Sequence, residues 1–126
     1  MCLVIKQLEP KIADKDIICY KLVKRTKTKG AYKSSFQGFE YVIRQLYTNN
    51  INIKFSHKLV YHREFFGYFI SKGMFHSYAN YLSAITILPN CVTLKCIIPK
   101  GAYYFEGYFG NYPSYASSQI RILEEI

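Results

Sequence analysis

Residues 16–25, DIICYKLVKR, carry the clearest structural pattern in this chain of 126 residues. From position 18 onward the side chains alternate between two faces, one with Ile18, Tyr20 and Leu22 and the other with Cys19, Lys21 and Val23. A period of two is typical of a β-strand, so we expect a strand over residues 17–25. The next segment, TKTKG at 26–30, has the composition of a turn that closes on Gly30.

Residues 38–50, GFEYVIRQLYTNN, change to a helical pattern. Their apolar side chains recur at i, i+3, i+4, i+7 and i+8, at Phe39, Val42, Ile43, Leu46 and Tyr47. This spacing predicts one stripe of an amphipathic helix that ends at Asn49 and Asn50.

A second, shorter helix is expected after Gly73. Ser77 is placed to cap its first turn, and Pro89 to end it. The apolar side of this helix would consist of Tyr78, Leu82 and Ile85.

Several strands complete the pattern. Alternation predicts strands within 51–61 and over 92–98, while the apolar run 65–70 is ambiguous. The pair Lys100-Gly101 turns into the aromatic segment 102–109, a loop follows at 110–114, and a closing strand is expected over 119–123. This order indicates an α+β fold with a mostly antiparallel sheet and two helices, and the length suits a single domain spanning residues 1–126.

The net positive charge is confined to one half of the chain. The formal net charge is +9, and residues 1–63 hold 13 Lys and Arg against 4 acids, whereas residues 64–126 hold 4 against 4. Such asymmetry indicates that one face meets a polyanion or an acidic protein surface.

Most of this charge lies in residues 20–36, YKLVKRTKTKGAYKSSF, which contain no carboxylate. We expect its cations to contact nucleic acid or an acidic partner, namely Lys21, Lys24, Arg25, Lys27, Lys29 and Lys33. The alternative is a mobile, solvated loop whose lysines serve only solubility.

Aromatic residues are the second candidate for an interface, because tyrosine offers a large apolar area with a polar tip. The predicted interface aromatics are Tyr32, Phe36, Tyr104, Tyr108, Tyr112 and Tyr115. The alternative is that most of them cover the core of a chain that has no Trp.

Catalytic and metal chemistry find little support. Cys91 and Cys96 are five positions apart and would face opposite sides of a strand, so neither a bridge nor a shared metal is expected, and no cofactor is predicted. His76 is the best-placed histidine for catalysis, with Ser77, Cys96 or Glu106 as conceivable partners. No catalytic residue is assigned, and the chain is predicted not to be an enzyme.

Neither export nor membrane insertion is expected. The apolar runs are a few residues long, far short of the roughly 18 to 20 that a spanning helix needs. Residues 1–10 also lack the pattern of a signal peptide. We therefore expect a soluble, cytoplasmic protein, with its oligomeric state left open.

Four short stretches are spread over most of the chain, namely CYKLVKR, GMFHSY, KCIIPKGAYYFEG and YASSQIRI. Together they resemble small proteins of bacteriophages and mobile elements of Bacteroidetes-like bacteria. This resemblance implies a counter-defence inhibitor of the anti-CRISPR type, whose partner would be a host protein or ribonucleoprotein effector. It assigns no individual residue.

Three functions therefore remain open. The first is a non-enzymatic inhibitor that binds a host nucleic-acid-directed effector or its RNA. The channels of such effectors are positively charged, so a basic inhibitor would contact the bound RNA or an acidic patch rather than mimic nucleic acid. The second is a stand-alone domain that binds RNA or single-stranded DNA. The third is a small enzyme or nucleotide-binding protein centred on His76 and Tyr78.

Overall fold

The computed structural model describes residues 3–5, 11–34, 39–48, 59–62, 67–70, 75–80, 91–109 and 111–126. All regular structure within these ranges is β. The strands are β1 (Leu3–Ile5), β2 (Lys11–Ile12), β3 (Ile17–Arg25), β4 (Ala31–Ser34), β5 (Glu40–Val42), β6 (Leu46–Thr48), β7 (Leu59–His62), β8 (Gly67–Ile70), β9 (Phe75–Tyr78), β10 (Cys91–Ile98), β11 (Tyr103–Phe109), β12 (Tyr112–Ser117) and β13 (Gln119–Glu125).

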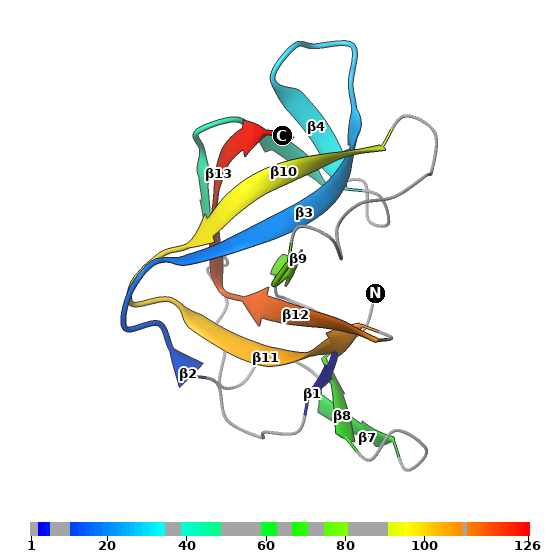
Figure 1. The fold of residues 1–126 in the computed structure, drawn as a ribbon, viewed down its shortest axis with the longest axis vertical. Helices are drawn as coiled ribbons and strands as arrows, with labels where there is room; N and C mark the ends of the chain where they lie inside the picture. Colours follow the sequence, from blue (N-terminus) through cyan, green and yellow to red (C-terminus); the bar gives the residue numbers. More distant parts are fainter. Residues whose placement is uncertain are drawn as a thin grey trace.

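These strands form one antiparallel sheet with the order β6-β13-β10-β3-β9-β12-β11-β1-β8-β7. Three strands lie off this path, since β4 pairs with β3 and β5, and β2 pairs with β11. In Figure 1, β10 and β3 lie above β12 and β11, with the short β9 between them. We call these parts the β3–β10–β13 half and the β9–β12–β11 half.

The two halves are joined at a fork on one edge of β3. The other edge of β3 pairs with β10 from Ile17 to Lys24. On the forked edge, β9 pairs with β3 only at Tyr20 and Tyr78, and β4 takes over from Val23 onward. The intervening residues, Lys21 and Leu22, therefore lie where two strands diverge.

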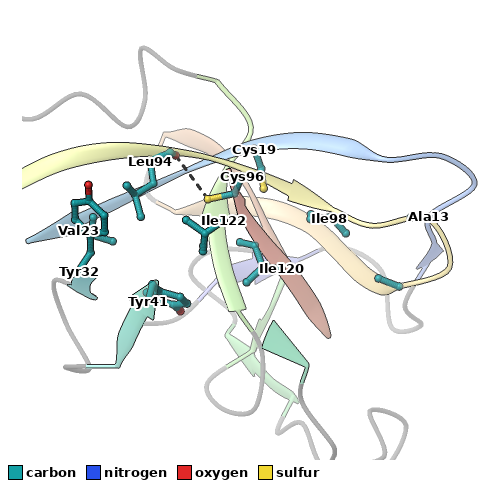
Figure 2. Close-up of a cluster of buried hydrophobic side chains, with 11 residues drawn as sticks. Ala13, Cys19, Val23, Tyr32, Tyr41, Leu94, Cys96, Ile98, Ile120 and Ile122 are labelled. Atoms are coloured by element: carbon teal, nitrogen blue, oxygen red, sulfur yellow. Dashed lines mark hydrogen bonds between the residues drawn. The ribbon is translucent and has the colours of Figure 1, made fainter. Parts of the chain in front are cut away.

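The main core lies on one face of the β3–β10–β13 half (Figure 2). Its fully buried side chains come from alternate positions of three strands, at Cys19, Val23, Leu94, Cys96, Ile98, Ile120 and Ile122. Tyr32 and Tyr41 close it from β4 and β5. Removal of each large aliphatic side chain from water contributes about 1.5–3 kcal/mol, so this layer is the main source of stability in this half.

The predicted α+β fold is wrong, because the described residues contain no helix. The stripe expected over residues 39–47 belongs instead to β5 and β6, separated by a turn in which Arg44 has a φ of 69°. Three of the stripe residues are exposed, namely Phe39, Val42 and Leu46, while Tyr41 from outside the stripe is in the core. The other two stripe residues, Ile43 and Tyr47, pack against the core, so the stripe does not form one face.

The second predicted helix is also wrong in its described part. Ser77 and Tyr78 belong to strand β9, where Ser77 is a buried strand residue and not a helix cap. The remaining positions assigned to that helix, Leu82 and Ile85, lie outside the described residues. The four residues of β9 are held by pairing with β12, a partner more than thirty positions away that local pattern does not reveal.

Most of the strand predictions are confirmed. The strand expected over 17–25 has those bounds as β3, and the strands expected near 92–98 and 119–123 are present as β10 and β13. Gly30 and Gly101 occupy the expected turns with φ of 82° and 90°. The loop expected at 110–114 is shorter than predicted, because β12 begins at Tyr112. Of the strand expected within 51–61, only positions from 59 onward are described, at the start of β7.

Candidate functional site

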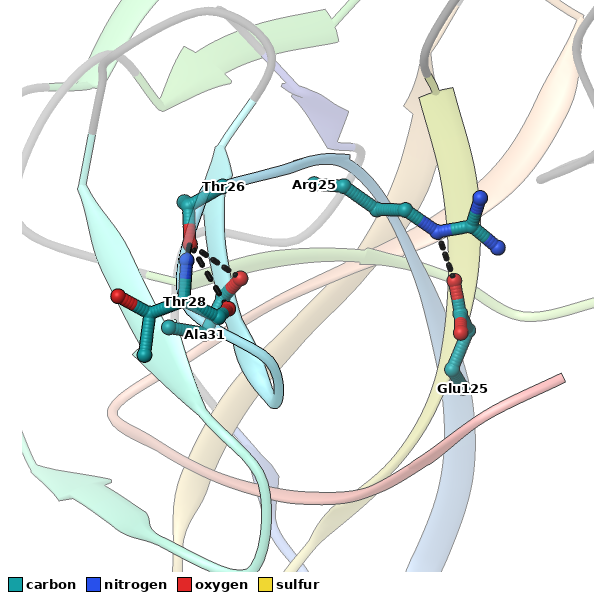
Figure 3. A network of polar contacts seen from close by, with 5 residues as sticks. All are labelled: Arg25, Thr26, Thr28, Ala31 and Glu125. Atoms are coloured by element: carbon teal, nitrogen blue, oxygen red, sulfur yellow. Dashed lines mark hydrogen bonds and ion pairs between the residues drawn. The ribbon is translucent and has the colours of Figure 1, made fainter.

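The β3–β4 hairpin, residues 23–34, carries the basic stretch singled out in the sequence. Its tip is held by hydrogen bonds around Thr26 (Figure 3). The Thr26 hydroxyl accepts from the Thr28 N–H at 3.2 Å, and its own hydrogen is directed at the carbonyl oxygens of Ala31 (2.9 Å) and Thr28 (3.1 Å). The Ala31 N–H donates back to Thr28 O at 3.2 Å. Exposed Lys27 and Lys29 are therefore presented by an ordered turn.

Below the tip, two lysines face each other across the hairpin. Lys24 on β3 is the register partner of Lys33 on β4, and both are exposed. Like charges directly opposite each other in an antiparallel pair destabilise it. On its other side Lys33 lies opposite Glu40 of β5, whereas Lys24 lies opposite Cys91 of β10. The hairpin thus brings together four exposed lysines, Lys24, Lys27, Lys29 and Lys33. The repulsion between Lys24 and Lys33 lowers the stability of the hairpin.

The fifth cation of the hairpin is already paired. Arg25 Nε donates to Glu125 Oε1 at 2.8 Å, joining β3 to β13 (Figure 3). Burial raises the pKa of the neighbouring Tyr32 hydroxyl, and Glu125 raises it further. Glu125 therefore offsets part of the charge on Arg25 and fixes the base of the hairpin.

Lys21 does not share this surface. It is 7% exposed, on the core face of β3. Its Nζ donates to the carbonyl oxygen of His76 and lies 4.9 Å from the centroid of the Tyr41 ring. Burial lowers the pKa of Lys21, because loss of water disfavours the charged amine. This lysine is a structural contact between β3, β5 and β9.

A second cluster of titratable groups surrounds His76 on strand β9. Burial, with a smaller effect of Lys21, lowers the pKa of His76 to about 3. Its ring lies 5.0 Å from that of Tyr78, nearly edge-on. A histidine with so low a pKa is neutral at pH 7 but accepts protons poorly, so it is a weak general base.

The predicted partner Cys96 and its cross-strand neighbour Cys19 are poorly suited to nucleophilic catalysis. Burial raises the pKa of Cys19 to about 11 and raises that of Cys96 as well, and a thiol that stays protonated is unreactive. Glu106 is engaged elsewhere, with Lys11 Nζ 2.9 Å from its Oε2. Ser77, which is fully buried, lies close enough to Cys19 to lower that pKa slightly against the effect of burial.

The three described cysteines are free thiols, and Cys91 and Cys96 face opposite sides of β10 as predicted, Cys96 in the core and Cys91 half-buried. Within the described ranges, no three His, Cys, Asp or Glu side chains gather as a metal site would require. Nor does that part of the chain contain a helix with the length and apolar character needed to cross a membrane.

The predicted interface aromatics are dispersed. Tyr32 is buried in the core, and Phe36 lies outside the described residues. Tyr108 and Tyr112 are each 50% exposed at one end of the β11–β12 hairpin, while Tyr104 and Tyr115 are half-buried with ring centroids 5.9 Å apart. All four belong to the β9–β12–β11 half, whereas the lysines belong to the other half (Figure 1). The basic and aromatic residues therefore do not form one patch.

Two contacts at the site could not be anticipated from the sequence. Glu125 reaches Arg25, and His76 reaches Lys21, across long separations in the chain. For the contact between Arg25 and Glu125, the sequence offered only an acid just after a predicted strand. For the contact between Lys21 and His76, it offered only a lysine on the same predicted strand face as Cys19 and Val23.

No protein-family model, curated protein or solved structure matches this chain.

Proposed function

We propose that this protein is a non-catalytic inhibitor that contacts an anionic surface of a host protein or ribonucleoprotein effector through its β3–β4 hairpin. The observation that carries the proposal is the pairing of Lys24 with Lys33 beneath an ordered tip that presents Lys27 and Lys29. An anionic partner would remove the repulsion between the paired lysines, so part of the binding energy would come from strain already present in the free protein.

The ordered tip supports binding over a purely solubilising role. A mobile loop would lose conformational entropy when its lysines are fixed against a partner. In this hairpin the backbone of residues 26–31 is already held by the Thr26 hydroxyl and by pairing of Thr26 N with Ala31 O at 3.3 Å. The lysines then lose only side-chain freedom on binding.

The chemistry around His76 supports a role without catalysis. Its pKa of about 3 and the raised pKa values of Cys19 and Cys96 make these three described groups a weak base and poor nucleophiles at neutral pH. The nature of the partner follows from the resemblance to small phage and mobile-element proteins: it would be an effector that handles nucleic acid in the bacterial cytoplasm, and the hairpin would contact its RNA or an acidic patch.

Affinity purification from a bacterial host, with and without nuclease treatment, tests this proposal. The hairpin variant replaces Lys24, Lys27, Lys29 and Lys33 with Gln. A matched control removes four cations elsewhere, at Lys15, Lys95, Lys100 and Arg121. We expect one protein or ribonucleoprotein to be retained by the wild type and by the control, and to be lost from the hairpin variant.

Two outcomes would overturn the proposal. Equal loss of the partner from both variants would mean that net charge alone, and not the hairpin, drives retention. Recovery of naked RNA or DNA, with no protein after nuclease treatment, would instead favour a stand-alone nucleic-acid-binding domain. In that case binding would fall with salt in proportion to the number of phosphates contacted.

A further inference from the structure

Two buried cysteines lie directly opposite each other on the ladder that joins β3 to β10. Cys19 of β3 is the register partner of Cys96 of β10, and both side chains are fully buried on the core face (Figure 2). Opposite residues of an antiparallel pair have α-carbons about 4.5–5.5 Å apart. A disulfide requires about 4.4–6.8 Å between the two α-carbons. The backbone therefore already holds these two cysteines at bridging distance.

We propose that Cys19 and Cys96 are a redox-active pair that forms a reversible disulfide across the core of the β3–β10–β13 half. Both are free thiols here, so this structure represents the reduced form. The pair is independent of the proposed binding function, because neither cysteine belongs to the basic hairpin.

The local structure allows the adjustment that the bond needs. Cys96 Sγ lies 3.7 Å from the carbonyl oxygen of Leu94, so the side chain must rotate to meet Cys19. The pairing of β10 with β13 is shifted between Lys95 and Cys96. Such a bulge interrupts the ladder on one side of the strand and bends the backbone locally. Cys96 is therefore held less rigidly on its β13 side than on its β3 side.

The reaction needs a peroxide as the oxidant and a local opening of the strands. Burial raises the pKa of both thiols, so the attacking thiolate forms when one of them reaches water. It takes one oxygen from hydrogen peroxide to become a sulfenic acid, and the other oxygen leaves as water. The second thiol then attacks the sulfenic sulfur, forms the S–S bond and releases that oxygen as water. Two electrons thus pass from the two sulfur atoms to one peroxide, and the products are one disulfide and two waters.

The bond would join distant parts of the chain, since β3 lies in the first third and β10 in the last third. A cross-link between distant positions lowers the conformational entropy of the unfolded chain. The disulfide should therefore raise the urea concentration at which the protein unfolds, and reduction should restore the original midpoint.

A variant with Cys2→Ser and Cys91→Ser keeps only the proposed pair and tests it directly. The dilute protein is treated with hydrogen peroxide until the thiol content is constant. Free thiols are then counted by maleimide labelling after unfolding, and linked peptides are identified by mass spectrometry without reduction. We expect both thiols to disappear together, with the Cys19 and Cys96 peptides linked within one molecule. Treatment with dithiothreitol should return both thiols and the lower urea midpoint.

The matched control adds Cys96→Ser to the same variant, which leaves Cys19 without its cross-strand partner. Its urea midpoint should not rise after peroxide treatment. The proposal is overturned if the variant that keeps the pair retains both thiols, if it is linked only between molecules, or if its disulfide lowers the midpoint. Should a serine variant not fold, peptide mapping of the oxidised wild type decides instead. A link from Cys19 to Cys96 supports the pair, whereas a link from Cys91 to either of them contradicts it.

Discussion

Arg25 and Glu125 join the base of the basic hairpin to the last strand, with 2.8 Å between Arg25 Nε and Glu125 Oε1. The guanidinium keeps its terminal nitrogens directed away from this carboxylate (Figure 3). The pair is partly exposed, so it contributes little to stability. Its larger effect is on the charge that the hairpin presents to a partner.

Glu125→Gln should therefore strengthen binding to polyanions. Loss of the carboxylate leaves Arg25 uncompensated at the base of the hairpin, which adds about one cation to the hairpin. On a heparin column the variant should elute at higher salt than the wild type. Glu124→Gln is the matched control, because it removes the same charge from a residue that lies opposite Lys95. Equal shifts for the two variants would show that heparin senses only net charge.

Lys24→Glu should stabilise the free protein while weakening binding to the partner. The substitution converts the repulsive pair with Lys33 into an attractive one, worth about 0.2–1 kcal/mol in the free energy of unfolding. Urea unfolding at low salt measures the gain, which should shrink in 0.5 M salt. The Debye length is roughly 10 Å at about 0.1 M salt and shortens as the salt concentration rises, so the interaction between the two charges is screened more strongly. Lys95→Glu should do the opposite, because its cross-strand partner is Glu124. A loss of stability in Lys24→Glu would contradict the repulsion.

Lys21→Met should alter how stability depends on pH. Because burial lowers the folded-state pKa of Lys21 from 10.5, the unfolded chain holds this proton to a higher pH than the native protein does. The contribution of Lys21 to the free energy of unfolding therefore becomes more favourable as the pH rises toward 10.5. The difference in unfolding free energy between wild type and Lys21→Met should shift in favour of the wild type from pH 7 to pH 10. A difference that stays constant, or that shifts toward the variant, would contradict a lowered pKa for Lys21.

Gly30→Ala should destabilise the hairpin by about 1 kcal/mol. Gly30 has a φ of 82°, where a β-carbon meets unfavourable contacts with its own backbone. The space around it is open, so the cost is conformational and not a clash with neighbours. Gly30→Asn should recover part of the loss, since Asn tolerates this conformation better. Equal unfolding midpoints for Gly30→Ala and the wild type would argue against strain at this turn.

Local alternation was sufficient to predict β3, β10 and β13, because each pairs along much of its length and buries one face. It did not show which face of β3 is buried. The apolar set Ile18, Tyr20 and Leu22 looks like the inner face, yet Cys19, Lys21 and Val23 are inside. The decisive information lies on β10, where Leu94 and Cys96 face the core and lie opposite Lys21 and Cys19.

The first predicted helix is wrong because the residues at helical spacing do not share a face in the structure. Two short strands and the turn at Arg44 divide them, so that Val42 and Leu46 are exposed while Ile43 and Tyr47 pack against the core. The site was predictable in part: the exposed lysines of the hairpin follow from composition and turn chemistry. The burial of Lys21 and the separation of lysines from tyrosines depend on pairings between distant segments.

The pairing of early strands with late ones has a consequence during synthesis. β1 needs β11, and β3 needs β10, so the core face of the first third of the chain stays uncovered until residues 91–109 leave the ribosome. Contacts between such distant segments form slowly, and exposed strand edges invite association with other chains in the meantime. The sheet is therefore expected to fold only after β10 and β13 have emerged from the ribosome, and nascent chains would depend on chaperones until then.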